Sequence, residues 1–210
     1  MKRIFDIVVA LLILVLVTPV LAGIALAIRF TDGSGVLFRQ ERIGLEGRTF
    51  VMRKFRTMST PSSGRSFDPA TDAVRITRLG QLLRSTSLDE LPTLINVLVG
   101  DMSLVGPRPL PVEYRERYTA EQFRRHEVRP GVTGLAQVRG RNRLSWDDRF
   151  ALDVEYVETK TMAGDIRLLA ATVLPVLSRS GVSGVGAVTM SEFRGTVDDA
   201  GVESPPASTG

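Results

Sequence analysis

The first part of the chain carries a nearly unbroken run of hydrophobic residues, and the remainder alternates between apolar and polar positions. Residues 7–28 form the apolar run, 22 positions in length. At about 1.5 Å per helical residue the run would be roughly 33 Å long, enough to cross the hydrocarbon core of a bilayer. A cleaved signal peptide has a shorter apolar core, and residues 29–32 lack the small residues of a cleavage site. The pattern therefore predicts a membrane helix over residues 1–33.

Thr18 and Pro19 interrupt this run near its middle. A proline inside a helix removes one backbone hydrogen bond and clashes with the preceding turn, so we expect a bend there. Kinked helices also span membranes, and basic residues stand on both sides of the run, with Lys2 and Arg3 before it and Arg29 after it. A spanning helix and a hairpin-like helix that enters and leaves one leaflet are therefore both open from these residues alone.

The pattern after the membrane segment predicts a small β-hairpin followed by a loop. Residues 35–40 and 49–56 read as short strands, and a glycine-containing turn at residues 43–47 separates them. Residues 59–72 are rich in Ser, Pro, Gly and Asp, which is typical of a mobile loop.

Helical spacing and polar composition account for most of the remaining chain. Leucines at helical spacing predict a helix over residues 79–94, which residues 96–100 close. Residues 112–128 read as a charged surface helix, and a further helix is expected over residues 145–160, with Ser145 as N-cap. A helix over residues 166–177 is too short to span a membrane and is therefore a core or interfacial helix. We expect an α+β fold, mainly helical: a membrane helix (1–33), a folded domain (34–190) and a disordered tail (191–210).

The composition excludes several kinds of active site but does not identify the binding partner. The net charge of +4 and pI near 9.9 suit nucleic acid, anionic lipid or a phosphorylated small molecule, and charge alone does not choose among them. The chain has no cysteine, which excludes disulfides, thiolate zinc sites and cysteine nucleophiles. His126 is the single histidine, which argues against zinc catalysis and a serine–histidine triad.

Asp89 and Glu90 are the first candidates for chemistry, because they stand side by side between Leu88 and Leu91. Adjacent positions on a helix point about 100° apart, so one solvated face does not accommodate both carboxylates and a polar pocket is expected. Two carboxylates without soft ligands suit Mg²⁺, with Mn²⁺ as an alternative ion. A simpler interpretation also stands, in which Ser87 is an N-cap and Glu90 completes a capping box.

Two rigid turns, residues 106–109 and 129–134, each carry an arginine, Arg108 and Arg129. Proline fixes the backbone, glycine lets amide N–H groups approach an anion, and arginine supplies a charge-assisted fork. Together the two turns predict a cradle for a diphosphate.

Six motifs in order resemble the bacterial sugar transferase family, the monotopic phosphoglycosyl transferases that start surface glycan assembly on a lipid carrier. The motifs are Lys2-Arg3 with Asp6, KFRTM (54–58), SLDELP (87–92), GDMSLVGPRP (100–109), VRPGVTGLAQ (128–137) and GRN (140–142). The resemblance implies a monotopic membrane protein with a re-entrant N-terminal helix and interfacial amphipathic helices, at the cytoplasmic face of the bacterial inner membrane. The family breaks this helix at Ser-Pro, where this chain has Thr18-Pro19, and Glu155 replaces a frequent aromatic residue.

The resemblance also implies residue roles and substrates. Asp89 matches the nucleophile, Glu90 its partner that helps hold Mg²⁺, and Arg108 the arginine associated with substrate phosphate. Lys54 and Arg84 match basic residues near the site. The implied reaction transfers a sugar 1-phosphate from a UDP-sugar to polyprenyl (undecaprenyl) phosphate through a covalent aspartyl intermediate.

The implied partners are these two substrates and membrane lipid, without nucleic acid; a homodimer and the identity of the sugar are left open. A noncatalytic membrane scaffold and a nucleotide-sugar hydrolase are the rival interpretations.

Overall fold

The structure is a computed structural model that describes residues 1–32, 35–59, 75–140, 144–178 and 192–195. Its long elements are α1 (Lys2–Asp32), β1 (Leu37–Ile43), β2 (Thr49–Phe55), α3 (Arg78–Ser85), α4 (Thr93–Val99), α7 (Trp146–Thr159) and α8 (Met162–Ser178). Shorter elements are β3 (Ser103–Val105), α5 (Ala120–Phe123), β4 (Gly131–Thr133) and α6 (Leu135–Arg139), with 3₁₀ turns at Leu45–Gly47, Leu88–Glu90, Val112–Arg117 and Arg124–Glu127. The described chain is thus mainly helical with small sheets, as predicted.

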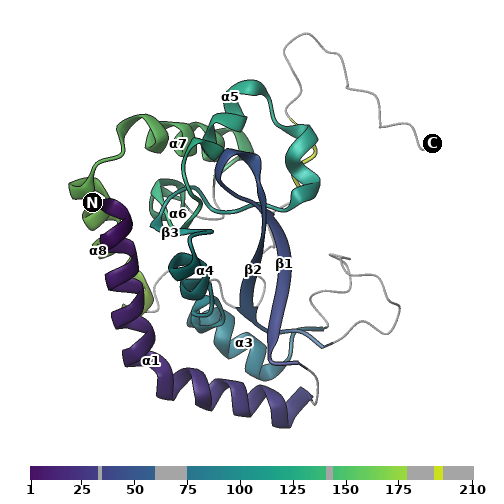
Figure 1. Cartoon of the computed structure of the whole chain (residues 1–210). Helices are drawn as coiled ribbons and strands as arrows, with labels where there is room; N and C mark the ends of the chain where they lie inside the picture. Colours follow the sequence, from purple (N-terminus) through teal and green to yellow (C-terminus); the bar gives the residue numbers. More distant parts are fainter. Residues whose placement is uncertain (33–34, 60–74, 141–143, 179–191, 196–210) are drawn as a thin grey trace.

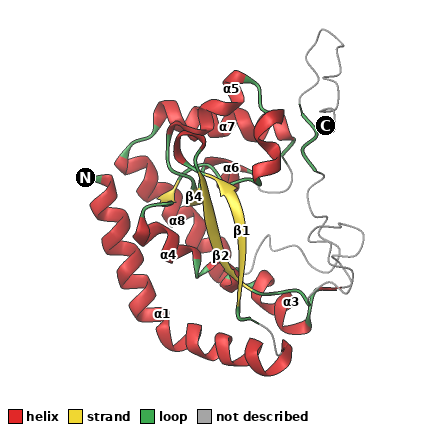
Figure 2. Ribbon diagram, turned by 45° about the vertical axis from the view of Figure 1, so that its right-hand side comes forward, coloured by secondary structure: helices red, strands yellow, loops and turns green. Residues whose placement is uncertain are grey.

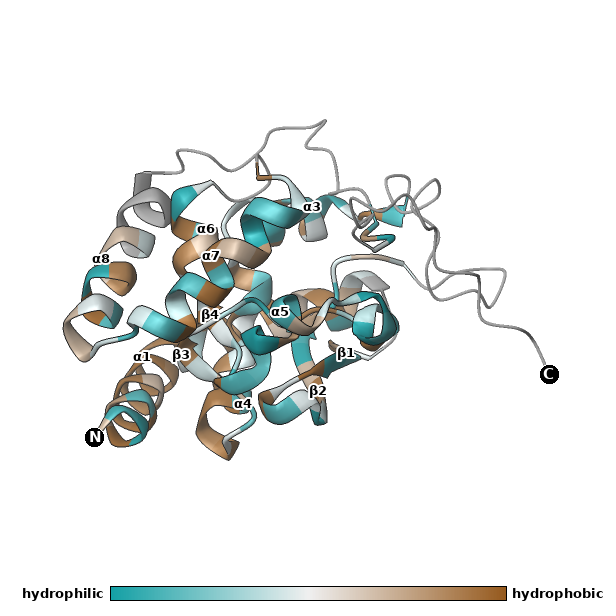
Figure 3. Ribbon diagram, turned by 90° about the horizontal axis from the view of Figure 1, so that it is seen from above, coloured by the Kyte–Doolittle hydropathy of each residue, from teal (hydrophilic) through white to brown (hydrophobic). Residues whose placement is uncertain are grey.

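Helix α1 is long, apolar and bent near its middle (Figure 1), and Pro19 lies inside it. Thr18 Oγ1 donates a hydrogen bond to the Leu14 carbonyl at 2.7 Å, the back-bond that often bends helices. Among the described residues, Lys2–Thr31 is the one helix long and apolar enough to cross a membrane. Only 6% of its most apolar window is buried against protein, unlike the core helix of a soluble domain. In Figure 3 much of the α1 ribbon has the brown colour of hydrophobic residues.

Polar contacts fasten the start of α1 to the folded domain. Asp6 is buried and accepts a hydrogen bond from Ser103 Oγ at 2.8 Å. Lys2 Nζ lies 2.5 Å from Asp165 Oδ2 on α8. Arg3 donates to the carbonyl of Val97 at 2.7 Å, near the end of α4, where helix carbonyls lack intrahelical partners. These contacts account for the basic and acidic residues at the start of the sequence.

The far end of α1 returns to the same domain. Ile28 is buried in a cluster with Phe55 of β2 and Leu83 of α3. Helix α4 lies between the first half of α1 and strand β2 (Figures 1 and 2). Both ends of α1 therefore contact one folded unit.

The predicted hairpin is confirmed. Strands β1 and β2 pair antiparallel, from Leu37 opposite Phe55 to Ile43 opposite Thr49. Buried Asn96 of α4 joins this hairpin, because its side chain donates to the Val51 carbonyl at 2.7 Å. The hairpin and α4 consequently form one rigid support.

The helix predicted over residues 79–94 is divided into α3 and α4. The acidic pair was expected inside one helix, but it lies in the turn between the two. Helix α3 ends at Ser85, Ser87 adopts a left-handed conformation (φ 57°), and Asp89 lies in the 3₁₀ turn that follows. Pro92 lacks an N–H and starts a new helix, α4, instead of continuing the first. Ser87 makes no side-chain capping bond, so the capping-box alternative is wrong. The predicted end is confirmed at Gly100, which has φ 103°.

The predicted surface helix over residues 112–128 is also wrong. The segment forms a 3₁₀ turn, the short helix α5 and a second 3₁₀ turn. Thr119 and Gln122 form a capping box that starts α5 anew. Arg125 and His126 point inward and are buried, which a solvated charged face would not produce.

The C-terminal predictions have mixed outcomes. Helix α7 is confirmed with Ser145 as N-cap, and α8 begins four residues earlier than the predicted residue 166. Within the predicted tail, Phe193 is only 1% exposed and packs with buried aromatic residues, so the anchored chain extends to this position. The rest of the predicted tail, and nearly all of the predicted loop over residues 59–72, lie outside the described residues.

Candidate active site

The structure brings Glu90 between two basic side chains from distant parts of the sequence. Lys54 Nζ, from β2, lies 2.6 Å from Glu90 Oε1. Arg108 Nη2, from the turn after β3, lies 2.6 Å from the same oxygen. The 3₁₀ turn at Leu88–Glu90 thereby meets the hairpin and the Pro-Arg-Pro turn, and three of the predicted site residues come together.

These contacts determine the charge state of Glu90. Burial alone would raise its pKa, but the positive charges of Arg108 and Lys54, together with their hydrogen bonds, outweigh burial and hold the pKa well below its usual range. In turn, Glu90 raises the pKa of Arg108. Burial lowers the pKa of Lys54, although Glu90 opposes this effect. Glu90 is therefore an anion held by two cations at neutral pH.

Asp89 has a different environment although it is the neighbouring residue. Its side chain is partly buried and, within the described part of the chain, its carboxylate accepts no hydrogen bond. Burial and the adjacent negative charge of Glu90 raise the pKa of Asp89, and the charges of Lys54, Arg84 and Arg108 only partly compensate. Of the two carboxylates, Asp89 is the one whose two oxygen atoms both lack a hydrogen bond within the described residues.

The remaining two predicted basic residues lie in different places. Arg84, on α3, donates from Nε to Thr57 Oγ1 at 2.9 Å, and its charge acts on Asp89. Arg129 is exposed and donates from Nε to the Gly100 carbonyl at 2.9 Å, at the end of α4. The structure therefore groups Arg84 with the acidic pair and places Arg129 at another position.

The glycines of the two rigid turns pack backbone against backbone, which corrects the predicted amide cradle. Gly106 N–H donates to the Thr133 carbonyl at 2.8 Å, and Gly131 N–H donates to the Pro107 carbonyl at 2.9 Å. A Cβ atom on Gly131 would lie 2.1 Å from Gly106 N. Because these amides already have backbone partners, they are not available to bind an anion.

Sequence reasoning missed Arg42, a partly buried cation of β1 whose charge interacts with Arg108 and Glu90. Burial, and then the like charge of Arg108, lower its pKa to about 10, while Glu90 opposes the shift. Arg42 Nη2 donates to Gln40 Oε1 at 2.6 Å. Glu113 compensates the charge of Arg42 more than Glu90 does. The place of Arg42 on an ordinary strand offered no signal. Lys54, Arg84 and Arg108 are the cations that act on Asp89, three cations against two carboxylates, an excess that suits an anionic substrate.

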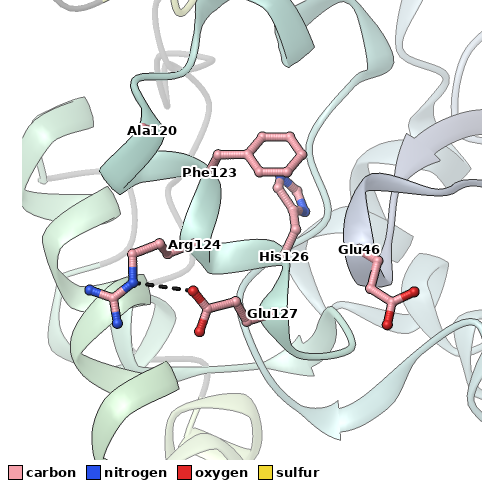
Figure 4. A pocket seen from close by; sticks show the side chains of 6 residues that line it. All are labelled: Glu46, Ala120, Phe123, Arg124, His126 and Glu127. Carbon is pink, nitrogen blue, oxygen red and sulfur yellow. Dashed lines mark hydrogen bonds and ion pairs between the residues drawn. The ribbon is translucent and has the colours of Figure 1, made fainter.

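His126 lies apart from this site. It lines a pocket of about 170 Å³ beside the hairpin turn, with Glu46, Ala120, Phe123, Arg124 and Glu127 (Figure 4). Burial, and then the charge of Arg125, lower the pKa of His126 to about 3, so the ring is neutral near pH 7. None of these pocket residues belongs to the acidic pair or to the cations that act on it.

The donor set at the acidic pair fits a hard cation. Within the described residues, no group of three or more His, Cys, Asp or Glu side chains could enclose a metal. Mg²⁺ commonly binds through one or two carboxylates and completes its shell with water and substrate phosphate. Within the described residues the Asp89 carboxylate oxygens accept no hydrogen bond, and Glu90 Oε2 has only a long contact of 3.5 Å with Arg108. Asp89 and Glu90 Oε2 are therefore the oxygen donors at this position that would hold Mg²⁺.

Comparisons with known proteins agree with this arrangement. Residues 1–179 match the sequence model of the bacterial sugar transferases. The chain belongs to the bacterial sugar transferase family. A sugar transferase of this family, EpsL of Bacillus subtilis, is 43% identical and aligns over 94% of this chain and 98% of its own length.

Two further enzymes are nearly as similar to this chain as EpsL is. The UDP-glucose:undecaprenyl-phosphate glucose-1-phosphate transferase of Escherichia coli is 42% identical over 82% of this chain, which spans only 39% of that enzyme. The enzyme of the same name from Caulobacter vibrioides is 41% identical over 84% of this chain and 70% of its own length. The family predicted from the six motifs is confirmed.

The two carboxyl groups are expected to titrate on opposite sides of their ordinary values. Asp89 should titrate above the usual aspartate pKa of about 3.9, and Glu90 below the usual glutamate pKa of about 4.3. In Glu90→Gln the pKa of Asp89 should fall, because a neighbouring negative charge is lost and Lys54 and Arg108 become free to act on Asp89. Carbon-13 NMR of labelled carboxyl groups measures both values, and Asp89→Asn assigns the signal. An Asp89 pKa that does not respond to Glu90→Gln contradicts this electrostatic account.

Proposed function

We propose that this sugar transferase moves a sugar 1-phosphate from a UDP-sugar to undecaprenyl phosphate, or a similar polyprenyl phosphate, and releases UMP. The relatives named for this transfer support the substrate class. One observation carries the chemistry: within the described chain the Asp89 carboxylate accepts no hydrogen bond, and it lies beside Glu90 under the influence of three cations, Lys54, Arg84 and Arg108. The arrangement suits an anionic substrate that reacts with Asp89.

Asp89 attacks the β-phosphorus of the UDP-sugar. A bond forms between a carboxylate oxygen and this phosphorus, and the bond from the phosphorus to the bridging oxygen breaks, so that UMP leaves with its electron pair. An oxygen of the polyprenyl phosphate then attacks the same phosphorus and displaces Asp89, which yields a polyprenyl diphosphate sugar. The nucleophile is a carboxylate, so the first step needs no general base.

The cations around Asp89 and Glu90 balance the charge of the diphosphate. Lys54 supplies a compact charge, whereas the planar guanidinium of Arg108 can contact two phosphate oxygens at once. Asp89 and Glu90 would hold Mg²⁺, which when bound neutralises charge on the diphosphate. Because Glu90 already orients both Lys54 and Arg108, it fixes the cations before the substrate arrives.

We further propose that α1 is re-entrant and that the site faces the cytoplasm at the membrane surface, where polyprenyl phosphate presents its headgroup. The contacts of α1 support this topology, since Lys2 and Ile28 both touch the same folded domain. A spanning helix would separate its ends by about 30 Å of hydrocarbon.

Cysteine labelling tests the re-entrant topology in a chain without native cysteine. A cysteine inserted after Met1 and one replacing Thr31 should both react with an impermeant maleimide from the cytoplasmic side only. Pro19→Leu should restore about one helix hydrogen bond and reduce this one-sided pattern, whereas Val20→Leu should preserve it. If the two introduced cysteines react from opposite sides of the membrane in the chain that keeps Pro19, the helix is not re-entrant.

Asp89→Asn should abolish transfer while leaving substrate binding intact. The amide keeps the shape of the side chain but lacks the anionic oxygen, so turnover should fall by roughly 10⁴-fold or more. The assay measures UMP release from a panel of UDP-sugars, with and without undecaprenyl phosphate, and UDP-sugar affinity by calorimetry. Near-normal turnover in Asp89→Asn would refute the assigned nucleophile, and sustained release without acceptor would indicate a hydrolase.

Turnover should depend on Mg²⁺ or Mn²⁺. Removal of divalent ions with EDTA should abolish UMP release, and added Mg²⁺ should restore it, because the site offers only oxygen ligands. Zn²⁺, which prefers nitrogen and sulfur ligands, should not replace it. Full activity in excess EDTA excludes the metal role of Asp89 and Glu90.

A further inference from the structure

A buried ion pair supports the backbone of Arg108 from behind. Arg125 and Asp153 are each about 1% exposed, and Arg125 Nη2 lies 2.7 Å from Asp153 Oδ2. The same Nη2 donates to the Arg108 carbonyl at 2.8 Å. Arg108 in turn forms an ion pair with Glu90. A displacement of Arg125 would therefore move the Arg108 backbone and change the contact between Arg108 and the acidic pair.

Two aromatic rings enclose the Arg125 guanidinium. Its carbon Cζ lies 5.8 Å from the ring centre of Tyr118 and 5.3 Å from that of Phe150. Tyr118 also accepts a hydrogen bond from Arg125 Nη1 at 3.1 Å. An ion pair in such surroundings is strong only while water is kept away, since entering water screens the attraction.

Phe193 covers both of these rings from the far end of the chain. Its ring centre lies 4.9 Å from that of Phe150 and 5.8 Å from that of Tyr118, which it stacks against. Phe193 is itself only 1% exposed. The residue lies beyond residues 1–179, the part of the chain that matches the family model.

Polar contacts attach this C-terminal segment on both sides of the ring. Arg117 Nη1 lies 2.7 Å from Glu192 Oε1 and also donates to the Phe193 carbonyl. The Phe193 N–H donates to the Tyr114 hydroxyl at 3.3 Å. Side-chain packing and backbone bonds thus fix Phe193 in one position.

We propose that residues 192–195 form a strap that keeps the Arg125–Asp153 pair dry and thereby positions Arg108 at the acidic pair. Phe193 is a positioning residue in this arrangement, because it touches neither Glu90 nor Asp89 and acts through the two rings, Arg125 and the Arg108 carbonyl. The functional part of this inference rests on the proposed role of Arg108 in binding the diphosphate. The positional part does not depend on any substrate.

Two truncations separate the strap from the residues that follow it. One chain ends after Ser191 and lacks the strap, and the matched control ends after Gly195 and keeps it. Hydrogen exchange of the peptide around residues 104–112 should become faster in the first chain and remain at the wild-type rate in the control. Unchanged exchange of this peptide in the chain ending at Ser191 overturns the inference, whether or not the wild type proves to be a transferase.

Point variants then test whether the effect reaches the site. Phe193→Ala should raise KM for UDP-glucose or lower kcat by roughly 10- to 100-fold, as expected for a displaced positioning group, and Phe193→Leu should restore much of the loss. Fluorescence of Trp146, the single tryptophan, reports the packing, since its ring centre lies 5.4 Å from Phe193. If Phe193→Ala changes the Trp146 fluorescence but leaves KM and kcat unchanged, the inference is overturned. It is also overturned if hydrogen exchange becomes uniformly faster throughout the folded domain, because that result would show a structural role only.

Discussion

Glu90 is the point on which the site depends, because its carboxylate joins three segments that are far apart in the sequence. Lys54 and Arg108 both lie 2.6 Å from Glu90 Oε1. Without this shared anion, two cations would face each other across a partly buried site, and their repulsion would spread the hairpin and the Pro-Arg-Pro turn apart. The same arrangement leaves Asp89 as the second, more basic carboxylate. One electrostatic constraint therefore both closes the site and distinguishes the roles of two adjacent acidic residues.

The rest of the fold holds the three segments at the right separation. Asn96 ties α4 to the hairpin that carries Lys54, and the glycines of the two turns allow backbone contact behind Arg108. Helix α1 contacts this same unit near both of its ends. The apolar helix and the site therefore belong to one folded unit.

Sequence patterns predicted what depends on local chemistry. The apolar run with Pro19, the hairpin, the Ser145 cap and the Gly100 helix end all arise from interactions within a few residues, and all are present. The motifs also identified Asp89, Glu90, Lys54, Arg84 and Arg108, which the structure brings to one region. These are features that neighbouring residues or a whole-family resemblance determine.

Features that depend on distant contacts were not predictable in this way. The charged run over residues 112–128 reads as a surface helix, and only the buried partner Asp153 explains why Arg125 turns inward. Phe193 sits in a small, polar stretch, and only the rings of Tyr118 and Phe150 reveal its place in the core. The glycines of the turns suggested an anion cradle, whereas their amides pair with each other. Each case was decided by a partner that sequence distance conceals.

Trapping the covalent adduct tests the central claim most directly. Wild-type protein incubated with a UDP-sugar and Mg²⁺, but without polyprenyl phosphate, should release about one UMP per active site in a burst and gain the mass of one phosphosugar. Peptide mass spectrometry should locate that mass on Asp89. Addition of undecaprenyl phosphate should then remove it. The absence of any mass gain on the Asp89 peptide, together with intersecting kinetics for the two substrates, would instead show direct transfer in a ternary complex and contradict the account.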